Sequence, residues 1–268
     1  MKIPVQIVKA FTTDPKLGNP AGVIFNTFEL NTTQMQKIAQ QVGISECVFI
    51  TQNQNAYNLR YFSPTKEMDF CGHATIAAYH AIGLAIPTNA SFETRIGDRA
   101  IEIRTDGLYT IDMGKLQNQY IIEEIPNIAD LIGTTKEDIK MAEVFNVGVP
   151  KLLIGLPTLN SLFNLQPNFL EIAEFCQKTG IRGFYPFTQE TLLSDSTFHA
   201  RQFNPWAGIS EDPITGVAGA ALGAWFGKNC IIEQGHCMNA FGRMFVEVAD
   251  TVKVGGQAVN FKNISIEI

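Results

Sequence analysis

The chain has 268 residues, of which 46% are hydrophobic, so it is long enough and apolar enough to form one large globular domain or two smaller ones. Its 20 Lys and Arg residues are outnumbered by 26 Asp and Glu residues, and the formal net charge of −6 repels the phosphate backbone of nucleic acid. Composition therefore argues against a nucleic-acid partner.

Neither a targeting signal nor a membrane segment is visible. The first residues alternate between apolar and polar types and lack the continuous apolar run of a signal peptide. Elsewhere no stretch approaches the roughly 20 apolar residues that a membrane-spanning helix needs. We expect a cytoplasmic protein that does not associate with a membrane.

The first element with clear boundaries is an amphipathic helix over residues 33–42, which Gly43 is placed to end. The apolar run at residues 47–50 follows as a predicted strand. Glu46 is then expected in the connection just before that strand.

Two alanine-rich segments, residues 73–84 and 217–226, are apolar on nearly every side. A helix without a polar face is normally enclosed by other elements. Residues 99–112 predict a β-hairpin, because two apolar runs flank an Asp-Gly turn pair, and residues 242–259 supply further strands. The sequence thus predicts central helices enclosed by sheets.

A divergent repeat indicates the domain organisation. Residues 60–72 and 201–216 both contain Arg-x-Phe-[Ser or Asn]-Pro, then an Asp, then a Gly that opens one of the apolar segments. Coincidence in Gly- and Pro-rich loops is the competing explanation, but several matches recur in the same order. We predict an α+β fold of two similar lobes, 1–116 and 117–268, each a curved sheet around a central helix, with a cleft between them. A strand near 254–268 is expected to return to the first lobe.

The glycines that open the two central helices are candidates for a binding site. If Gly72 and Gly216 begin these helices, unpaired backbone amides and the positive ends of two helix dipoles face the cleft and would bind a carboxylate. The missing side chain lets a ligand reach the amide. The alternative is that both glycines only permit close packing.

Four polar residues near these helices are candidates for acid/base chemistry. Glu46 is the only acidic residue in an apolar stretch, where burial would raise its pKa towards neutral pH; a solvated loop glutamate is the alternative. His73 is expected to be neutral, because the dipole of the helix that it begins disfavours an imidazolium. Asp69 and Asp212 precede the helices, and capping of free amides is favoured over orientation of the histidine.

The cysteines and histidines argue against metal and disulfide chemistry. The five cysteines have no C-x-x-C spacing and the four histidines form no H-x-x-x-H pattern, so we expect no metal and, without a nucleotide-binding glycine pattern, no organic cofactor. A two-thiol racemase would need a cysteine from each lobe, but Cys71 before Gly72 is matched by Thr215 before Gly216. Cys71 is therefore expected to be structural.

Five motifs occur in a fixed order along essentially the whole chain: Phe11 with Gly18-Asn-Pro-Ala-Gly-Val23, Ser45-Glu46-x-x-Phe49, Arg60-x-Phe-x-Pro64, Asp69-Phe-Cys-Gly-His-Ala-Thr75 and Glu211-Asp-Pro-x-Thr-Gly216. In this order they resemble the phenazine-biosynthesis PhzF-like family. The final Gly-Arg243 and Val254-Gly-Gly-Gln-Ala-Val259 resemble the family's C-terminal pattern.

The resemblance implies a diaminopimelate-epimerase-like fold with the active site between the lobes. In that family the glutamate matching Glu46 is the acid/base that moves a proton on the substrate. The residues matching His73 and Asp212 assist it.

The resemblance also implies that backbone amides near Gly72 and Gly216 hold the carboxylate of the ligand. The remaining substrate-binding candidates are Asn19, Ala74, Thr215 and Val217. Family members commonly carry a small polar residue at the position of Val217, so this chain lacks one side-chain hydrogen bond. This departure separates it from the best-known member, which isomerises a dihydro-hydroxyanthranilate in phenazine assembly.

The sequence predicts a cofactor-independent isomerase that moves a proton on a small carboxylic acid and forms a homodimer. A competing interpretation is a non-catalytic protein of the same fold that binds a small ligand or a partner protein. The joint presence of Glu46, His73 and Asp212 counts against it. A hydrolase using Ser45 is a third interpretation, but nothing resembles a nucleophile elbow.

Overall fold

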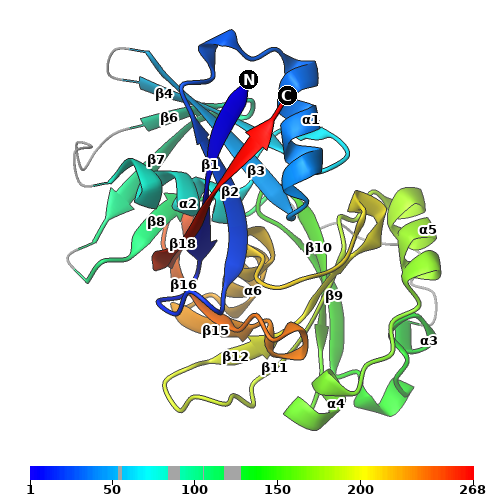
Figure 1. Ribbon diagram of the computed structural model, residues 1–268. Helices are drawn as coiled ribbons and strands as arrows, with labels where there is room; N and C mark the ends of the chain where they lie inside the picture. Colours follow the sequence, from blue (N-terminus) through cyan, green and yellow to red (C-terminus); the bar gives the residue numbers. More distant parts are fainter. Residues whose placement is uncertain (54–55, 84–90, 105, 118–127) are drawn as a thin grey trace. The chain divides into compact units, whose positions relative to one another are not determined.

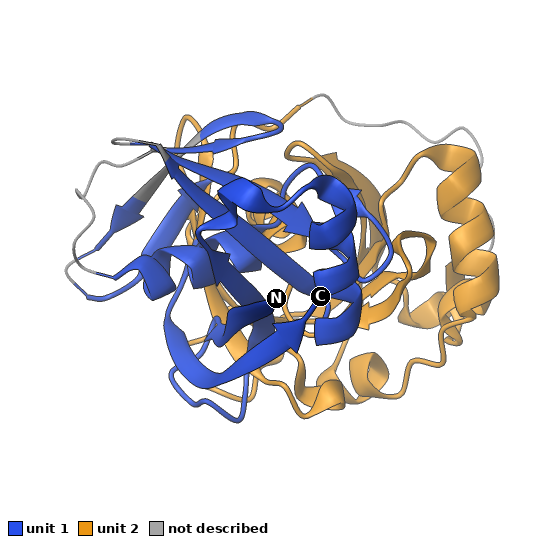
Figure 2. Cartoon of the chain, turned by 45° about the horizontal axis from the view of Figure 1, so that its top comes forward, with its two compact units in different colours: residues 1–112, 255–268 blue, residues 113–254 orange. Residues whose placement is uncertain are grey.

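The computed structural model describes residues 1–53, 56–83, 91–104, 106–117 and 128–268. The described chain forms two compact units, residues 1–112 with 255–268 and residues 113–254 (Figure 2). Leu84, the predicted end of the first apolar helix, lies outside the described residues.

The first unit is a sheet that contains both ends of the chain. Its elements are β1 (Lys2–Ala10), β2 (Asn19–Phe25), η1 (Thr27–Glu29), α1 (Thr32–Val42), β3 (Glu46–Asn53), β4 (Ala56–Phe62), β5 (Glu67–Met68), α2 (Gly72–Ile82), β6 (Ser91–Thr94), β7 (Gly97–Ile103), β8 (Tyr109–Asp112) and β18 (Ala258–Glu267). β1 lies between antiparallel β18 and β2, β2 runs parallel to β3, and β3 is antiparallel to β4. β1 and β18 run side by side to the chain ends (Figure 1), where the Met1 amine donates to the Ile268 carbonyl at 2.7 Å.

The central helix of this unit is α2. It contacts β1, β2, β3, β8 and β18, and residues 73–79 are all buried. An apolar helix of this kind needs cover on several sides. The prediction of an enclosed helix is therefore confirmed in this unit.

Local signals define α1 and the strand after it. The Asn31 side chain accepts from the Gln34 amide while the Gln34 side chain accepts from the Asn31 amide, both at 3.0 Å, which is a capping box. The helix ends at Gly43, whose φ of 69° suits glycine. β3 begins at Glu46, whose partner in the parallel strand β2 is Ala21, so Glu46 belongs to the strand and not to the preceding connection.

The structure contains the predicted β-hairpin. β7 and β8 pair antiparallel with Ile103 opposite Tyr109, and Gly107 in the turn has a φ of 80°.

Among the described residues, no helix combines the length and apolar composition that crossing a membrane requires.

The second unit repeats the plan with additional helices. Its elements are α3 (Ile128–Ile132), η2 (Lys136–Asp138), β9 (Met141–Asn146), β10 (Pro150–Gly155), α4 (Leu159–Phe163), α5 (Phe169–Thr179), β11 (Phe184–Thr188), β12 (Phe198–Ala200), β13 (Gln202–Asn204), η3 (Pro205–Ala207), β14 (Ile209–Asp212), α6 (Gly216–Phe226), β15 (Cys230–Gln234), η4 (His236–Met238) and β16 (Gly242–Val248); β17 (Val252–Gly256) crosses the boundary between the units. α5 packs Ile172 and Phe175 onto a core that includes Leu152 and Phe184 of the sheet.

The central helix of the second unit, α6, lies very close to its sheet. It contacts β9, β10 and β16, and residues 218–223 are all buried. Glycines on α6 permit this approach, because a Cβ built on Gly219 would lie 2.1 Å from Met244 Sδ and one on Gly223 would lie 2.4 Å from Val246 Cγ1. Close packing of α6 on β16 therefore depends on two missing side chains.

We expect Gly223→Ala to destabilise the protein by about 1–3 kcal/mol through overpacking against Val246, although alanine is the better helix former by about 1 kcal/mol. Urea unfolding of the single variants and of Gly223→Ala with Val246→Ala measures the effect. The shortened side chain should recover part of the loss. A neutral or stabilising Gly223→Ala would contradict the close approach.

Candidate active site

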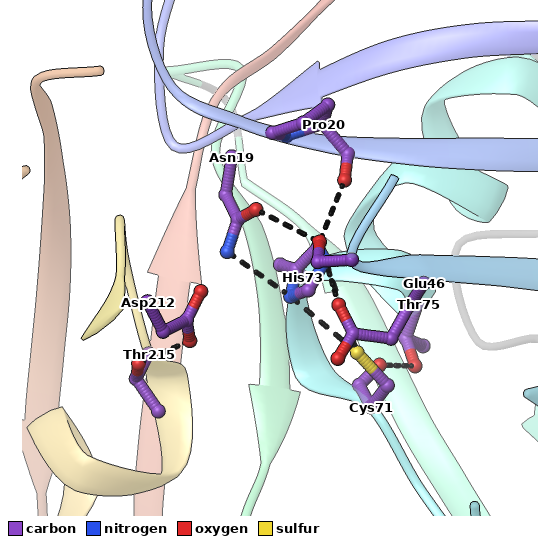
Figure 3. Close-up of polar contacts among 9 residues, drawn as sticks. Asn19, Pro20, Glu46, Cys71, His73, Thr75, Asp212 and Thr215 are labelled. Carbon is purple, nitrogen blue, oxygen red and sulfur yellow. Dashed lines mark hydrogen bonds and ion pairs between the residues drawn. The ribbon is translucent and has the colours of Figure 1, made fainter. Parts of the chain in front are cut away.

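Three elements of the first unit place polar side chains together. Asn19 begins β2, Glu46 begins the parallel strand β3, and His73 stands in the first turn of α2. Neighbouring parallel strands start at the same edge of a sheet, and α2 begins close to that edge, as Figure 3 shows. The fold thus brings together residues that are 54 positions apart in the sequence.

Glu46 and His73 form a buried pair. Glu46 Oε2 lies 3.1 Å from His73 Nε2, and the two residues are only 4% and 5% exposed. Oε2 has no hydrogen bond of ordinary geometry among the described residues. A buried carboxylate oxygen that is not fully satisfied can accept a proton or a ligand group.

The other nitrogen of the His73 ring contacts two side chains. His73 Nδ1 lies 3.4 Å from Asn19 Nδ2 and 3.4 Å from Cys71 Sγ (Figure 3). Ser45 Oγ lies 3.5 Å from Asn19 Oδ1 and 3.4 Å from the Pro20 carbonyl, either of which can accept its single proton, and the first contact helps to hold the Asn19 amide. These contacts fix the ring so that Nε2 faces Glu46. Cys71, which we expected to be structural, lies against the imidazole.

The protonation of Glu46 differs from the sequence expectation. Burial does raise the pKa of Glu46, but the charge and close polar contact of His73 and a hydrogen bond from Ser45 outweigh it and lower the pKa below its ordinary value. The expected upward shift was therefore wrong in sign, because it took account of burial without the partner.

The expectation of a neutral His73 also left out the effect of its partner, Glu46. Burial lowers the pKa of the imidazole, but the charges and hydrogen bonds of Cys71 and Glu46 outweigh it and raise the pKa well above its ordinary value. Burial also raises the pKa of the Cys71 thiol, so the lasting negative partner is the Glu46 carboxylate. Glu46 and His73 thus share a proton as a pair, and the helix dipole is too weak to decide the charge of the ring.

Two hydroxyl groups, and not an aspartate, stabilise the start of α2. Thr75 Oγ1 donates to the Cys71 carbonyl at 2.7 Å, and the Tyr61 hydroxyl lies 2.7 Å from Thr75 Oγ1. Asp69, which we expected to cap the helix, is exposed and lies 3.9 Å from Arg95 Nη1. Helix geometry leaves the first amides of α2 without an acceptor inside the helix, and the Ala74 amide donates to Cys71 Sγ instead.

In the second unit, Asp212 and Thr215 lie together before α6. Asp212 Oδ2 accepts a short hydrogen bond from the Thr215 hydroxyl (Figure 3), and Thr215 is the N-cap residue of α6. Gly216 and Val217 form its first turn. The binding candidates of this unit are therefore gathered at one helix end.

Gln234 holds this segment and was missed by the sequence analysis. Its Oε1 accepts from the Tyr185 hydroxyl at 3.0 Å and from the Thr215 amide at 3.3 Å, while its Nε2 donates to the Asp212 carbonyl at 2.8 Å. Gln234 is fully buried, so it fixes both ends of the four-residue loop before α6. No sequence pattern near a single glutamine indicates such a role.

A second histidine cluster lies elsewhere in the second unit. Glu233 Oε2 lies 2.8 Å from His199 Nδ1, and His199 Nε2 lies 3.1 Å from His236 Nδ1. Glu233 also accepts from the amides of Leu192 and Leu193 at 2.9 and 2.7 Å. These groups form hydrogen bonds with one another, and Glu233 connects the loop after β11 to β15.

Burial raises the pKa of Glu233, but the His199 hydrogen bond and the two amides outweigh it and lower the pKa to about 2. A depressed folded-state pKa contributes stability that is present above the ordinary value of 4.5 and is lost as the pH falls towards 2.

We expect Glu233→Gln to cost about 1–3 kcal/mol of unfolding free energy at pH 7. The gap from the wild type should narrow as the pH falls from about 5 towards 2. Denaturant unfolding at several pH values tests this, with exposed Glu174→Gln as the matched control. A gap that stays constant over this pH range would contradict the assignment.

Comparison with known proteins identifies the family. The family model described as phenazine biosynthesis-like protein, PhzC-PhzF, matches residues 8–263. The chain therefore belongs to this family. It is 32% identical to the uncharacterized isomerase YfhB of Bacillus subtilis, covering 90% of this chain and 88% of that protein. It is 31% identical to the uncharacterized isomerase YddE of Escherichia coli K12, covering 94% and 92%.

Solved structures confirm the fold. A PhzF-family phenazine biosynthesis protein from Bacillus anthracis matches with a TM-score of 0.91 and 25% identity, covering 100% of both chains. A putative PhzC/PhzF protein from Clostridium difficile matches with a TM-score of 0.80 and 30% identity over 99% of this chain and 100% of the other. A hydroxyproline epimerase from Agrobacterium vitis has a TM-score of 0.61 at 11% identity, over 99% and 92%, and shows the fold alone. The predicted α+β, epimerase-like fold is confirmed.

Proposed function

We propose that this protein is an isomerase that moves a proton on a small carboxylic acid without a cofactor, with Glu46 as the acid/base. The observation that carries this proposal is the buried Glu46 carboxylate beside His73, with Oε2 lacking an ordinary hydrogen bond among the described residues. General acids and bases are often poorly aligned before the substrate binds. Relatives named as isomerases support the class of reaction.

In the proposed reaction, Glu46 takes a proton from one carbon of the substrate and returns it to another. The electron pair left behind shifts along the substrate, so atoms and charge balance and no redox partner is needed. His73 stabilises the carboxylate form of Glu46 before the transfer, because Nε2 lies 3.1 Å from Oε2. Asn19 and Cys71 hold the ring through Nδ1.

We further propose that the substrate carboxylate binds to backbone amides at the starts of α2 and α6. Gly72 and Gly216 open these helices. Among the described residues, only Phe70 Cε1, at 4.0 Å, lies near a Cβ built on Gly72, so space remains there for a ligand. Asp212, held by Thr215, completes the site in this proposal, which draws on the sequence repeat and the family resemblance. The hydroxyproline epimerase of similar fold is itself described with a small carboxylic acid, trans-4-hydroxy-L-proline, bound.

A screen of small carboxylic acids in D₂O tests the reaction. We expect one class of acid to gain enzyme-dependent deuterium at a single carbon, detected by NMR and mass spectrometry. Glu46→Gln should lower the rate by about 10²–10⁴-fold, because the acid/base is lost. Exposed Glu29→Gln should exchange deuterium at the wild-type rate. Near-normal exchange by Glu46→Gln would remove Glu46 from the mechanism.

Ligand binding should respond differently from exchange. Glu46→Gln leaves the helix amides in place, so affinity for an exchanging acid should change far less than the rate. Titration followed by ¹⁵N NMR should shift the amides of residues 72–74 and 216–217. Binding without any exchange by the wild type would favour the alternative function, a non-catalytic ligand-binding protein. Binding that leaves these amides unshifted would reject the helix-end site.

The cellular location and the oligomeric state remain predictions. We propose that the protein acts in the cytoplasm and forms a homodimer. Analytical ultracentrifugation of the purified chain measures the second directly, and a mass equal to 29.6 kDa at all concentrations would reject it.

A further inference from the structure

We propose that Glu46, Cys71 and His73 form a binding site for a zinc-class divalent cation. One ligand atom from each residue lies within 4.8 Å of the other two. His73 Nε2 is 3.1 Å from Glu46 Oε2 and 4.0 Å from Cys71 Sγ. Ligands of one tetrahedral zinc ion lie roughly 3.2–3.7 Å apart, given metal–ligand bonds of about 2.0–2.3 Å. The Glu46 and His73 atoms are already close to this spacing, whereas Cys71 Sγ, which lies 3.4 Å from Nδ1 and 4.0 Å from Nε2, has to rotate towards the Nε2 side of the ring.

The chemistry of the three ligands suits a borderline-soft cation. A thiolate, an imidazole nitrogen and a carboxylate form a set that favours zinc over magnesium or calcium, which prefer oxygen alone. Three protein ligands leave a fourth position for water or a substrate oxygen. Binding would release two protons to the solvent, one from the Cys71 thiol and one from the Glu46–His73 pair, because the metal binds a thiolate and an unprotonated imidazole nitrogen.

A second observation points to a ligand at this place. Glu46 is only 4% exposed, and its Oε2 lacks an ordinary hydrogen bond among the described residues, so one buried acceptor is available. The opposite nitrogen of the ring, Nδ1, lies 3.4 Å from the Asn19 side-chain amide, so the ring is held with Nε2 facing Glu46.

The second histidine cluster provides a comparison. His199, Glu233 and His236 also bring three ligand atoms within 4.8 Å. There, however, the carboxylate is already used by His199 and by two backbone amides, and His199 Nε2 is paired with His236. A cation at Glu233 would have to displace all of these contacts, whereas at Glu46 it would displace only the contact with His73, so we place the site at Glu46.

The sequence analysis predicted no metal, and the physical reason for the difference is clear. The ligands come from the start of β3, from the residue before α2 and from its first turn, so residues 46, 71 and 73 match no spacing motif. Because the proposed function uses Glu46 as acid/base, a bound cation would withdraw this carboxylate from proton transfer. The site would then act as an inhibitory one.

Titration of the full-length, chelator-treated protein with Co²⁺ tests the site. We expect one saturable equivalent with a thiolate-to-cobalt charge-transfer band, displaced by Zn²⁺. Cys71→Ser should lose the band, and Glu46→Gln should weaken binding by at least about tenfold, since even loss of an outer-shell partner typically costs 10–100-fold. Cys176→Ser, which removes another buried thiol, and His236→Ala should retain the band. No saturable band, or a band that persists in Cys71→Ser, would overturn the proposal.

Two further measurements keep the test decisive. If Cys71→Ser fails to fold, X-ray absorption of the zinc-loaded wild type reports the ligands directly, and a shell without sulfur rejects the site. Deuterium exchange by the wild type in excess chelator separates this proposal from the proposed function. Exchange that continues with chelator and stops with one equivalent of Zn²⁺ supports both; exchange that is insensitive to zinc rejects only the inhibitory site.

Discussion

The contact between Glu46 and His73 is the interaction on which the functional interpretation of this protein depends. Two ionisable side chains are buried together at the edge where β2, β3 and α2 begin. Burying either charge alone would be costly, so each requires the other. The surrounding groups, Asn19 and Cys71 on the ring and Ser45 on the carboxylate, hold this pair in one geometry.

The two units solve one packing problem in different ways. α2 and α6 are both apolar on nearly all sides, and each is covered by strands of its own unit. The start of α2 is braced by Tyr61 through Thr75, whereas the loop before α6 is braced by Tyr185 through Gln234. A tyrosine hydroxyl therefore anchors each helix start, although the intermediate residues differ.

Much of the fold could be predicted because its signals are local. The glycine that ends α1, the Asp-Gly turn between β7 and β8, and the apolar helices are each encoded within about a dozen positions. The charges of the site could not be predicted in the same way. The pKa of Glu46 depends on a partner 27 positions away, so a correct inference of burial gave the wrong sign. Gln234 and the His199 cluster match no motif, since their partners are distant in sequence.

The pairing of β1 with β18 has a consequence for how the chain folds. The sheet of the first unit is completed only by residues 258–267, whereas the second unit is a continuous segment, residues 113–254. During synthesis the second unit can therefore reach its native structure while the first still has an unpaired strand edge, and unpaired edges favour association with other chains. In ribosome-bound nascent chains, residues 113–254 should thus become resistant to protease before residues 1–112 do.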